Sequence, residues 1–147
     1  MFKIQKKIIY AVEAVIDIAL NSGPNPVQNE AIAKRQGIPK RYLEQTLQLL
    51  VKNKILIGAR GPKGGYSLAK ERRKIKLSDI IYCVSEEENS NKIFQSNLSQ
   101  RIIIPILNEI KNKCIENFKD VSVEDICKLA KNKKILKTNS RKVDFVI

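Results

Sequence analysis

The chain has 147 residues, of which 43% are apolar, enough for one hydrophobic core of ordinary size or for a small domain with an additional arm. It carries 28 Lys and Arg against 15 Asp and Glu, a formal net charge of +13, which favours a polyanionic partner. With no run of 18 apolar residues, no signal-peptide pattern and only three widely spaced cysteines, we expect no membrane span, no disulfide framework and a cytoplasmic location.

The first predicted element is a helix over residues 2–20. Its broad apolar face recurs at helical spacing through Ile8, Val12, Val15 and Ala19. A loop rich in Gly, Pro and Asn follows at residues 21–26 and ends the helix.

Two short helices joined by a glycine-containing turn are predicted next. The first spans residues 29–36 and the second begins at residue 40. Gly37 can adopt the left-handed conformation that ends a helix, and Pro39 suits the start of the next one. Apolar residues then recur at helical spacing at Leu43, Leu47, Leu50 and Val51. This arrangement is typical of a helix-turn-helix.

The polar face of the second helix is a candidate DNA-reading surface. Its first turns present Lys40, Arg41, Tyr42, Glu44 and Gln45. In a helix-turn-helix, residues at the start of the second helix reach base edges in the major groove. Arg pairs with guanine, Gln pairs with adenine, and Glu accepts from cytosine. Considered alone, this segment is equally consistent with the solvated face of an ordinary helix.

A short hairpin is predicted directly after the two helices. Strands near residues 55–57 and 66–68 flank a Gly-rich tip that also carries Arg60 and Lys63. Glycines such as Gly64 let a backbone approach a phosphate, and an Arg can enter a narrow A·T-rich minor groove. A flexible basic turn would explain the glycines alone. It explains less well why the hairpin follows a helix-turn-helix, so the segment favours a wing.

The sequence YLEQ at residues 42–45, followed by RGPKGGYSLA at residues 60–69, resembles the bacterial Rrf-type winged-helix regulators, the IscR/NsrR/CymR-like group. The likeness extends from about residue 4 to residue 86, and more loosely over the helix after residue 98. It implies a homodimer that binds partly palindromic operators in double-stranded DNA and usually represses transcription. It also implies that Tyr42, Glu44, Gln45 and Arg60 contact DNA. Lys40 and Arg41 are expected to contact phosphates or bases because of their positive charge, independently of the resemblance. Lys63 and Gly64 at the tip complete the candidate DNA-binding residues.

The expected fold is therefore mainly α-helical with a small β-hairpin. A winged helix-turn-helix domain covers residues 1–85, with Ser78 expected to cap its last helix. An acidic linker follows at residues 86–97. The basic excess lies in the first part, because residues 1–83 hold 16 Lys and Arg against 6 Asp and Glu.

Residues 98–132 are predicted to hold a long dimerisation helix and a short C-terminal helix. An apolar stripe recurs every three to four residues at Ile103, Ile106, Leu107, Ile110, Cys114 and Phe118. The resemblance implies that this helix pairs with its mate, while a core helix of a monomer is the alternative. Pro105 places the helix start near residue 104 or else kinks the helix. Ser122 and Asp125 are expected to cap the short helix, and residues 133–147 form a basic tail without clear periodicity.

The cysteines of this chain do not match those that bind the cofactor in many members of the family. Many Rrf-type regulators hold an iron–sulfur cluster through three closely spaced cysteines in the linker. Here the linker has none and the chain has no histidine. Cys83, Cys114 and Cys127 are best explained as partly buried thiols, so we expect no cofactor. A cluster shared between Cys83 and Cys114 of the partner subunit, or a redox switch on an exposed cysteine, is the disfavoured alternative.

Two functions are consistent with these features. The first is a dimeric, sequence-specific transcriptional regulator, most simply a repressor, with a possible regulatory protein partner. The second is a winged-helix module for protein interaction with only weak, non-specific DNA binding. An enzyme is not expected, because the chain lacks histidine and its glycine-rich tip lacks the Gly-Lys-Ser/Thr ending of a nucleotide site.

Overall fold

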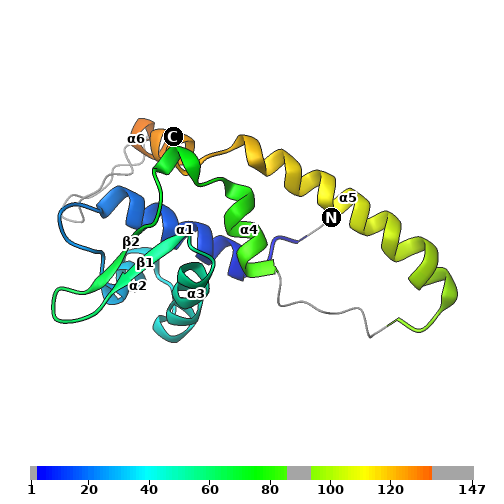
Figure 1. Cartoon of the computed structure of the whole chain (residues 1–147), viewed down its shortest axis with the longest axis horizontal. Helices are drawn as coiled ribbons and strands as arrows, with labels where there is room; N and C mark the ends of the chain where they lie inside the picture. The colour runs from blue at the N-terminus through cyan, green and yellow to red at the C-terminus, as the bar shows by residue number, and fades with distance from the viewer. Residues whose placement is uncertain (1–2, 86–93, 134–147) are drawn as a thin grey trace.

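The computed structural model describes residues 3–85 and 94–133 of the chain. Within those ranges it contains helices and one two-stranded antiparallel hairpin, which confirms the expected fold class (Figure 1). In chain order the elements are α1 (Lys6–Asn21), α2 (Asn29–Gln36), α3 (Lys40–Lys52), β1 (Leu56–Ala59), β2 (Gly65–Leu68), α4 (Leu77–Ser85), α5 (Ile104–Asn117) and α6 (Val123–Asn132). No helix in these ranges is both long and apolar enough to cross a bilayer.

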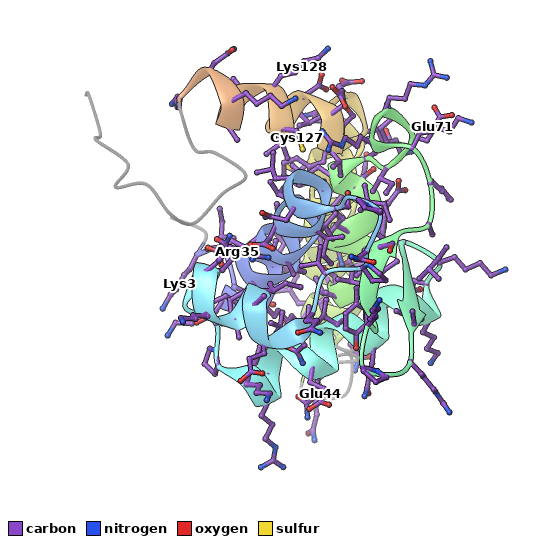
Figure 2. All side chains as sticks on the ribbon, turned by 90° about the vertical axis from the view of Figure 1, so that its left-hand side faces the viewer. Lys3, Arg35, Glu44, Glu71, Cys127 and Lys128 are labelled. Atoms are coloured by element: carbon purple, nitrogen blue, oxygen red, sulfur yellow. The ribbon has the colours of Figure 1, made fainter. Side chains whose placement is uncertain are left out.

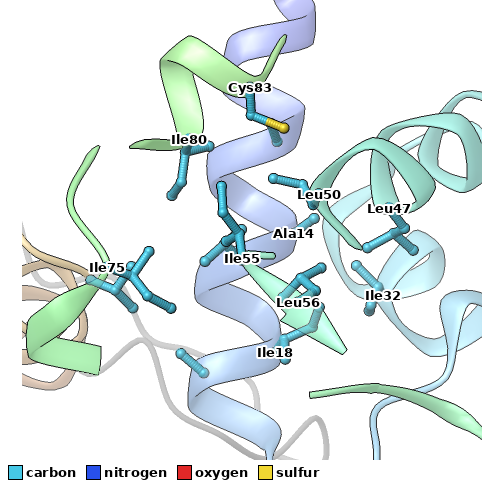
Figure 3. Close-up of a cluster of buried hydrophobic side chains, with 14 of the residues drawn as sticks. Ala14, Ile18, Ile32, Leu47, Leu50, Ile55, Leu56, Ile75, Ile80 and Cys83 are labelled. Atoms are coloured by element: carbon cyan, nitrogen blue, oxygen red, sulfur yellow. The ribbon is translucent and has the colours of Figure 1, made fainter. Parts of the chain in front are cut away.

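Helix α1 is the centre of the core, and α2, α3, α4 and α6 all pack against it. The side that faces them is fully buried and is built from small and branched residues, which let the other helices approach closely. These residues are Ala11, Ala14, Val15, Ile18 and Ala19. Figure 3 shows Ala14 and Ile18 surrounded by apolar side chains from the helix-turn-helix, the hairpin and α4. The helix begins at Lys6, four residues later than predicted, without a side-chain cap or an acidic first turn.

The hairpin extends from the end of α3. Leu56 pairs with Leu68 and Ala59 pairs with Gly65, so the turn lies between residues 59 and 65. Leu56 is buried against the core, whereas the rest of β1 is exposed. The hairpin therefore projects from the body with its tip free, as a wing does (Figure 1).

Helix α4 closes the winged-helix core with Ile80, Ile81 and Val84, all of which are buried. The predicted cap at Ser78 is wrong, because the helix already begins at Leu77 and Ser78 is buried within it. The carboxylate of Asp79 instead accepts a hydrogen bond of 2.9 Å from the backbone N–H of Lys76. Asp79 thus satisfies a donor just outside the first turn.

Helix α5 projects from the body as an arm (Figure 1). A π-helical turn, Ser99–Ile103, leads into it, and Pro105 occupies its first turn. Helical backbone already begins at Asn97, so residues 97–117 are helical without a break and Pro105 lies inside this segment, directly after the π-helical turn. Pro lacks a backbone N–H, and the π-helical turn before it is where the regular α-helical hydrogen-bond pattern is interrupted. The predicted start near residue 104 therefore holds only for the α-helical part, which begins at Ile104.

Helix α6 returns to the body. Ser122 and Asp125 form the predicted capping box, with reciprocal hydrogen bonds of 3.1 and 2.9 Å. A short antiparallel bridge ties the segment before α6 to the start of α4: Leu77 donates to Val121 O at 2.8 Å and Val123 donates to Ile75 O at 2.9 Å. Val123 and Cys127 are buried in the same core as α1. Most of the predicted linker, and the predicted tail after Lys133, lie outside the described residues.

Candidate nucleic-acid interface

The turn between α2 and α3 has the geometry that the sequence predicts. Gly37 lies in the left-handed region with φ of 66° and ψ of 29°, and it ends α2 by donating to the carbonyl of Ala33. Pro39 occupies the cap position of α3, where its fixed φ costs nothing. A non-glycine residue at position 37 would be strained even though no atom blocks a side chain there.

Helix α3 is buried on one side and open on the other. Leu43, Leu47 and Leu50 are fully buried, and each contributes on the order of 2 kcal/mol of hydrophobic stabilisation. The five predicted recognition residues are all exposed: Lys40, Arg41, Tyr42, Glu44 and Gln45. Figure 2 shows Glu44 at the end of the molecule opposite Lys128 of α6, pointing away from the body.

Tyr42 differs from the other exposed residues of α3 because its ring has an aromatic neighbour. The rings of Tyr42 and Tyr10 of α1 lie 5.4 Å apart, centroid to centroid, at an interplanar angle of 73°. Thr46 also donates to the backbone carbonyl of Tyr42 at 3.1 Å, which secures the first turn of the helix. The Tyr10 contact could not be predicted from local sequence patterns, because it joins residues 32 positions apart.

The wing tip carries the two predicted cations on its surface. Arg60 and Lys63 are exposed, whereas Gly64 is buried inside the tip. Gly64 donates to Gly61 O at 2.9 Å, and a Cβ at Gly64 would lie 2.4 Å from Ala59 O. The need for glycine at position 64 therefore arises within the turn itself.

The base of the wing is anchored to the segment before α2. Val27 and Tyr66 exchange two backbone hydrogen bonds, of 2.9 and 2.8 Å. Gly65 passes so close to this segment that a Cβ there would lie 2.4 Å from Val27 O. The pKa of Tyr66 is raised, first by burial and then by the negative charge of Glu44.

A buried carboxylate joins α2 to α1, and sequence reasoning missed it. Asp17 is fully buried and accepts hydrogen bonds from the Arg35 guanidinium at 2.7 and 2.9 Å and from the Gln36 amide at 2.7 Å. The hydrogen bonds to Asp17 raise the pKa of Arg35. An aspartate within the apolar run of α1 was the available signal, because a buried charge requires a partner.

The predicted dimerisation residues lie on α5 and directly at its two ends, and they are largely open to solvent. The exposed fractions of Ile106 and Leu107 are 51% and 53%, and Ile103, Ile110 and Cys114 are exposed as well. Phe118 is half-buried where the arm meets the body. Phe94, Leu98 and Ile102 extend this exposed apolar surface toward the start of the arm.

The three cysteines are far from forming one site. Cys83 is buried with its Sγ 3.4 Å from Leu49 O, and Cys127 is buried beside α1, where desolvation raises the pKa of its thiol. Cys114 is exposed on the arm. Within residues 3–85 and 94–133, no three His, Cys, Asp or Glu side chains are grouped so that they could hold a metal ion.

Comparison with known proteins agrees with this geometry. The model of the Rrf2 family, described as an iron-dependent transcriptional regulator, matches residues 4–129. The HTH-type transcriptional regulator IscR of Cronobacter sakazakii is 42% identical over 83 residues, which cover 56% of this chain and 51% of that protein. IscR of Photorhabdus laumondii is 41% identical over the same length. The chain thus spans about half the length of the curated relatives that it matches.

Solved structures cover more of the chain. The structure of T. potens IscR has a TM-score of 0.68 and 31% identity, covering 95% of this chain and 94% of that one. CymR of B. subtilis, named as its global cysteine regulator, has a TM-score of 0.65 and 25% identity, with 88% and 98% coverage. These relatives are transcriptional regulators rather than enzymes. The chain belongs to the Rrf2 family of winged-helix transcriptional regulators.

Proposed function

We propose that this chain regulates transcription by binding double-stranded DNA of a defined sequence as a homodimer. The observation that carries the proposal is the exposure of Lys40, Arg41, Tyr42, Glu44 and Gln45 on a helix whose other face is fully buried. Such a helix can enter a major groove with its first turns leading, without disturbing the core. Arg60 and Lys63 would then lie along the adjacent phosphates and minor groove.

The homodimer is supported by the arm. Exposed isoleucine and leucine side chains lie on the first half of α5, at Ile106, Leu107 and Ile110, and an apolar surface of this kind is rarely left open in a soluble protein. A second copy of α5 offers the same apolar chemistry, and a two-fold pair would present two recognition helices to a partly palindromic operator. Residues 1–85 together with the returning α6 would form the DNA-binding unit, and residues 98–120 would form the dimerisation arm. Binding over a promoter would make the protein a repressor.

Iron is not assigned a role in this proposal. The family description includes iron dependence. Two of the three cysteines are committed to the core, and the chain has no histidine. This donor set does not fit a cluster bound by closely spaced soft ligands within one chain. We therefore propose that DNA binding by this protein does not require a metal. Treatment with a chelator should leave its operator affinity unchanged.

Selection of bound duplexes from a random pool tests the function. The expected product is a set of sites with two related half-sites, spaced by about one helical turn or a small multiple of it. The experiment should be run at fixed salt, because each neutralised phosphate makes affinity fall with ionic strength. A pool without any shared sequence, together with a stoichiometric protein partner recovered on the arm, would instead favour the interaction module with weak DNA binding.

The Arg60→Ala variant tests the wing in the same assay. Removal of the guanidinium should weaken binding and relax the preference for A·T pairs at the positions beneath the wing, because a narrow minor groove attracts Arg. The exposed Arg73, in η1 (Arg72–Lys74), offers a matched control for the loss of one positive charge. The Arg73→Ala variant should select the same sites as the wild type. If Arg60→Ala also selects unchanged sites, Arg60 does not read the minor groove.

A further inference from the structure

We infer that Tyr10 of α1 is a positioning residue for DNA recognition, because it holds the ring of Tyr42 in one orientation before the duplex arrives. The inference rests on the proposed function, since it assumes that Tyr42 contacts DNA. It adds a residue outside the helix-turn-helix and the wing to the machinery of sequence recognition.

The geometry of the two rings favours a fixed arrangement. At 5.4 Å and 73° the rings meet edge to face, which brings the positive edge of one ring to the negative face of the other. Tyr10 is half-buried and packs against the hydrophobic core, so its own position is determined by α1. Tyr42 is 39% exposed, so its ring is available to a ligand while one side of it is held.

Preorganisation gives this contact a functional role. The backbone of Tyr42 is already fixed by α3 and by the hydrogen bond from Thr46, but these leave the ring free to change rotamer. A ring that samples several rotamers must be ordered when DNA binds, and this ordering weakens the complex. Contact with Tyr10 removes that freedom in the unbound protein. The resulting gain in affinity should appear with the operator, where the Tyr42 ring has a defined contact, and not with arbitrary duplexes.

A purely structural role for Tyr10 predicts something different. If the ring pair only stabilised the junction of α1 and α3, loss of Tyr10 would lower the melting temperature. It would change the affinity for operator and for unrelated DNA by the same factor. The ratio of the two affinities therefore separates positioning from stability.

The experiment uses the chain of 147 residues and four variants of it: Tyr10→Phe, Tyr10→Leu, Tyr42→Ala and the double variant Tyr10→Leu/Tyr42→Ala. Each is titrated with an operator obtained by selection and with a scrambled duplex of equal length. Tyr10→Leu should weaken operator binding by roughly 3- to 10-fold, the range expected for one aromatic pair, and leave binding to the scrambled duplex within about twofold. Tyr10→Phe keeps the ring and should bind within about twofold of the wild type. The double variant should bind no more weakly than Tyr42→Ala.

A control replaces a tyrosine whose exposure is similar to that of Tyr42. Tyr82 of α4 is 41% exposed and has no place in the proposed interface, so Tyr82→Leu should bind both duplexes like the wild type. If Tyr10→Leu does not fold, Tyr10→Met makes the same comparison, because it also removes the ring while retaining a large apolar side chain.

Three results would overturn the inference: an unchanged operator affinity in the folded Tyr10 variant, an equal loss on both duplexes, or losses that add in the double variant. Each of these leaves the proposed function intact, provided that the wild type still prefers its operator. A wild type without that preference would count against the proposed function itself.

Discussion

Single residues at the contacts between helices hold the helix-turn-helix, α2 and α3, against α1. Asp17 is the clearest case, because one carboxylate accepts three hydrogen bonds from two residues of α2. A buried charge with all its partners in place contributes little net stability, but removal of one partner leaves the others without compensation. The site thus joins the end of α2 to α1 directly.

The Asp17→Ala variant should therefore lose about 3 kcal/mol of unfolding free energy, because Arg35 is left with a largely buried charge. Urea denaturation followed by circular dichroism measures the loss. Arg73→Ala breaks the exposed pair with Glu71, whose side chains are 75% and 59% exposed, and should leave stability unchanged within error. Equal losses of unfolding free energy in the two variants would show that Asp17 does not stabilise the contact between α1 and α2.

At the scale of elements, the sequence predicted what is local. The spacing of Leu43, Leu47 and Leu50 predicts α3, and Gly37 predicts the turn between α2 and α3. The bounds of α2 and the capping box of α6 also agree with the prediction. Each of these features depends on residues within one or two helical turns, where periodicity and capping rules apply.

The contacts that the sequence did not reveal join residues far apart in the chain. The bridge between Val27 and Tyr66, the Asp17 site and the ring pair of Tyr10 leave no periodic pattern, because each involves only one or two residues on each side. The Ser78 cap was predicted wrongly because Asp79, one residue later, supplies the same kind of acceptor. Local rules predicted the exposed face of α3, but not the residues that hold this helix in place.

The wing provides a test at the scale of one element. A Cβ at Gly64 would meet Ala59 O at 2.4 Å and Gly61 O at 2.8 Å, both of them backbone atoms that cannot move aside without opening the turn. Gly64→Ala should displace Arg60 and Lys63 and weaken operator binding by on the order of 10-fold, while the melting temperature changes little. Gly58→Ala in the same hairpin is the matched control, since its nearest neighbour would be 3.7 Å away. Identical affinities for the two variants would exclude a fixed wing shape.

The cap of α6 gives a prediction about pH. Hydrogen bonds from Ser122 hold the pKa of Asp125 below its ordinary value in the folded protein. The stabilisation is thus fully present above the ordinary carboxyl pKa of about 4, and it is lost as the pH falls through the lower folded value. The destabilisation caused by Asp125→Ala, measured by urea denaturation, should be constant near neutral pH and shrink below about pH 4. Ser122→Ala should cost about 1 kcal/mol at neutral pH. A destabilisation by Asp125→Ala that grows as the pH falls would contradict this role of Asp125 in the cap.

At the scale of the whole molecule, the proposed DNA-binding surface and the proposed dimerisation surface lie on different parts of the structure. The exposed first turns of α3 lie on the winged-helix body, and the exposed apolar side chains lie on the projecting α5 (Figure 1). Helix α6 then returns to α1, so the arm is held to the body at its C-terminal end. Pairing of two arms would fix the separation of two reading surfaces, which is what a palindromic site requires.

Replacement of Leu107 by Asp tests this arrangement. A carboxylate in the centre of an apolar helix pair would be desolvated without a partner, so Leu107→Asp should shift the protein to monomer and abolish high-affinity operator binding. Analytical ultracentrifugation and a binding titration measure the two effects. By helical spacing Asn112 lies on the other side of α5, so Asn112→Asp adds the same charge as a control. A Leu107→Asp dimer of unchanged stability would remove α5 from the interface.

The central claim is that the exposed face of α3 reads bases, and a base-by-base affinity profile tests it most directly. The wild type and Gln45→Ala are titrated with the selected operator and with every single base-pair substitution of it. We expect Gln45→Ala to lose discrimination at one symmetry-related pair of positions, by about 1–3 kcal/mol, while it keeps the wild-type preference elsewhere. A uniform loss across all sequences, or a wild-type profile that is flat, would contradict it.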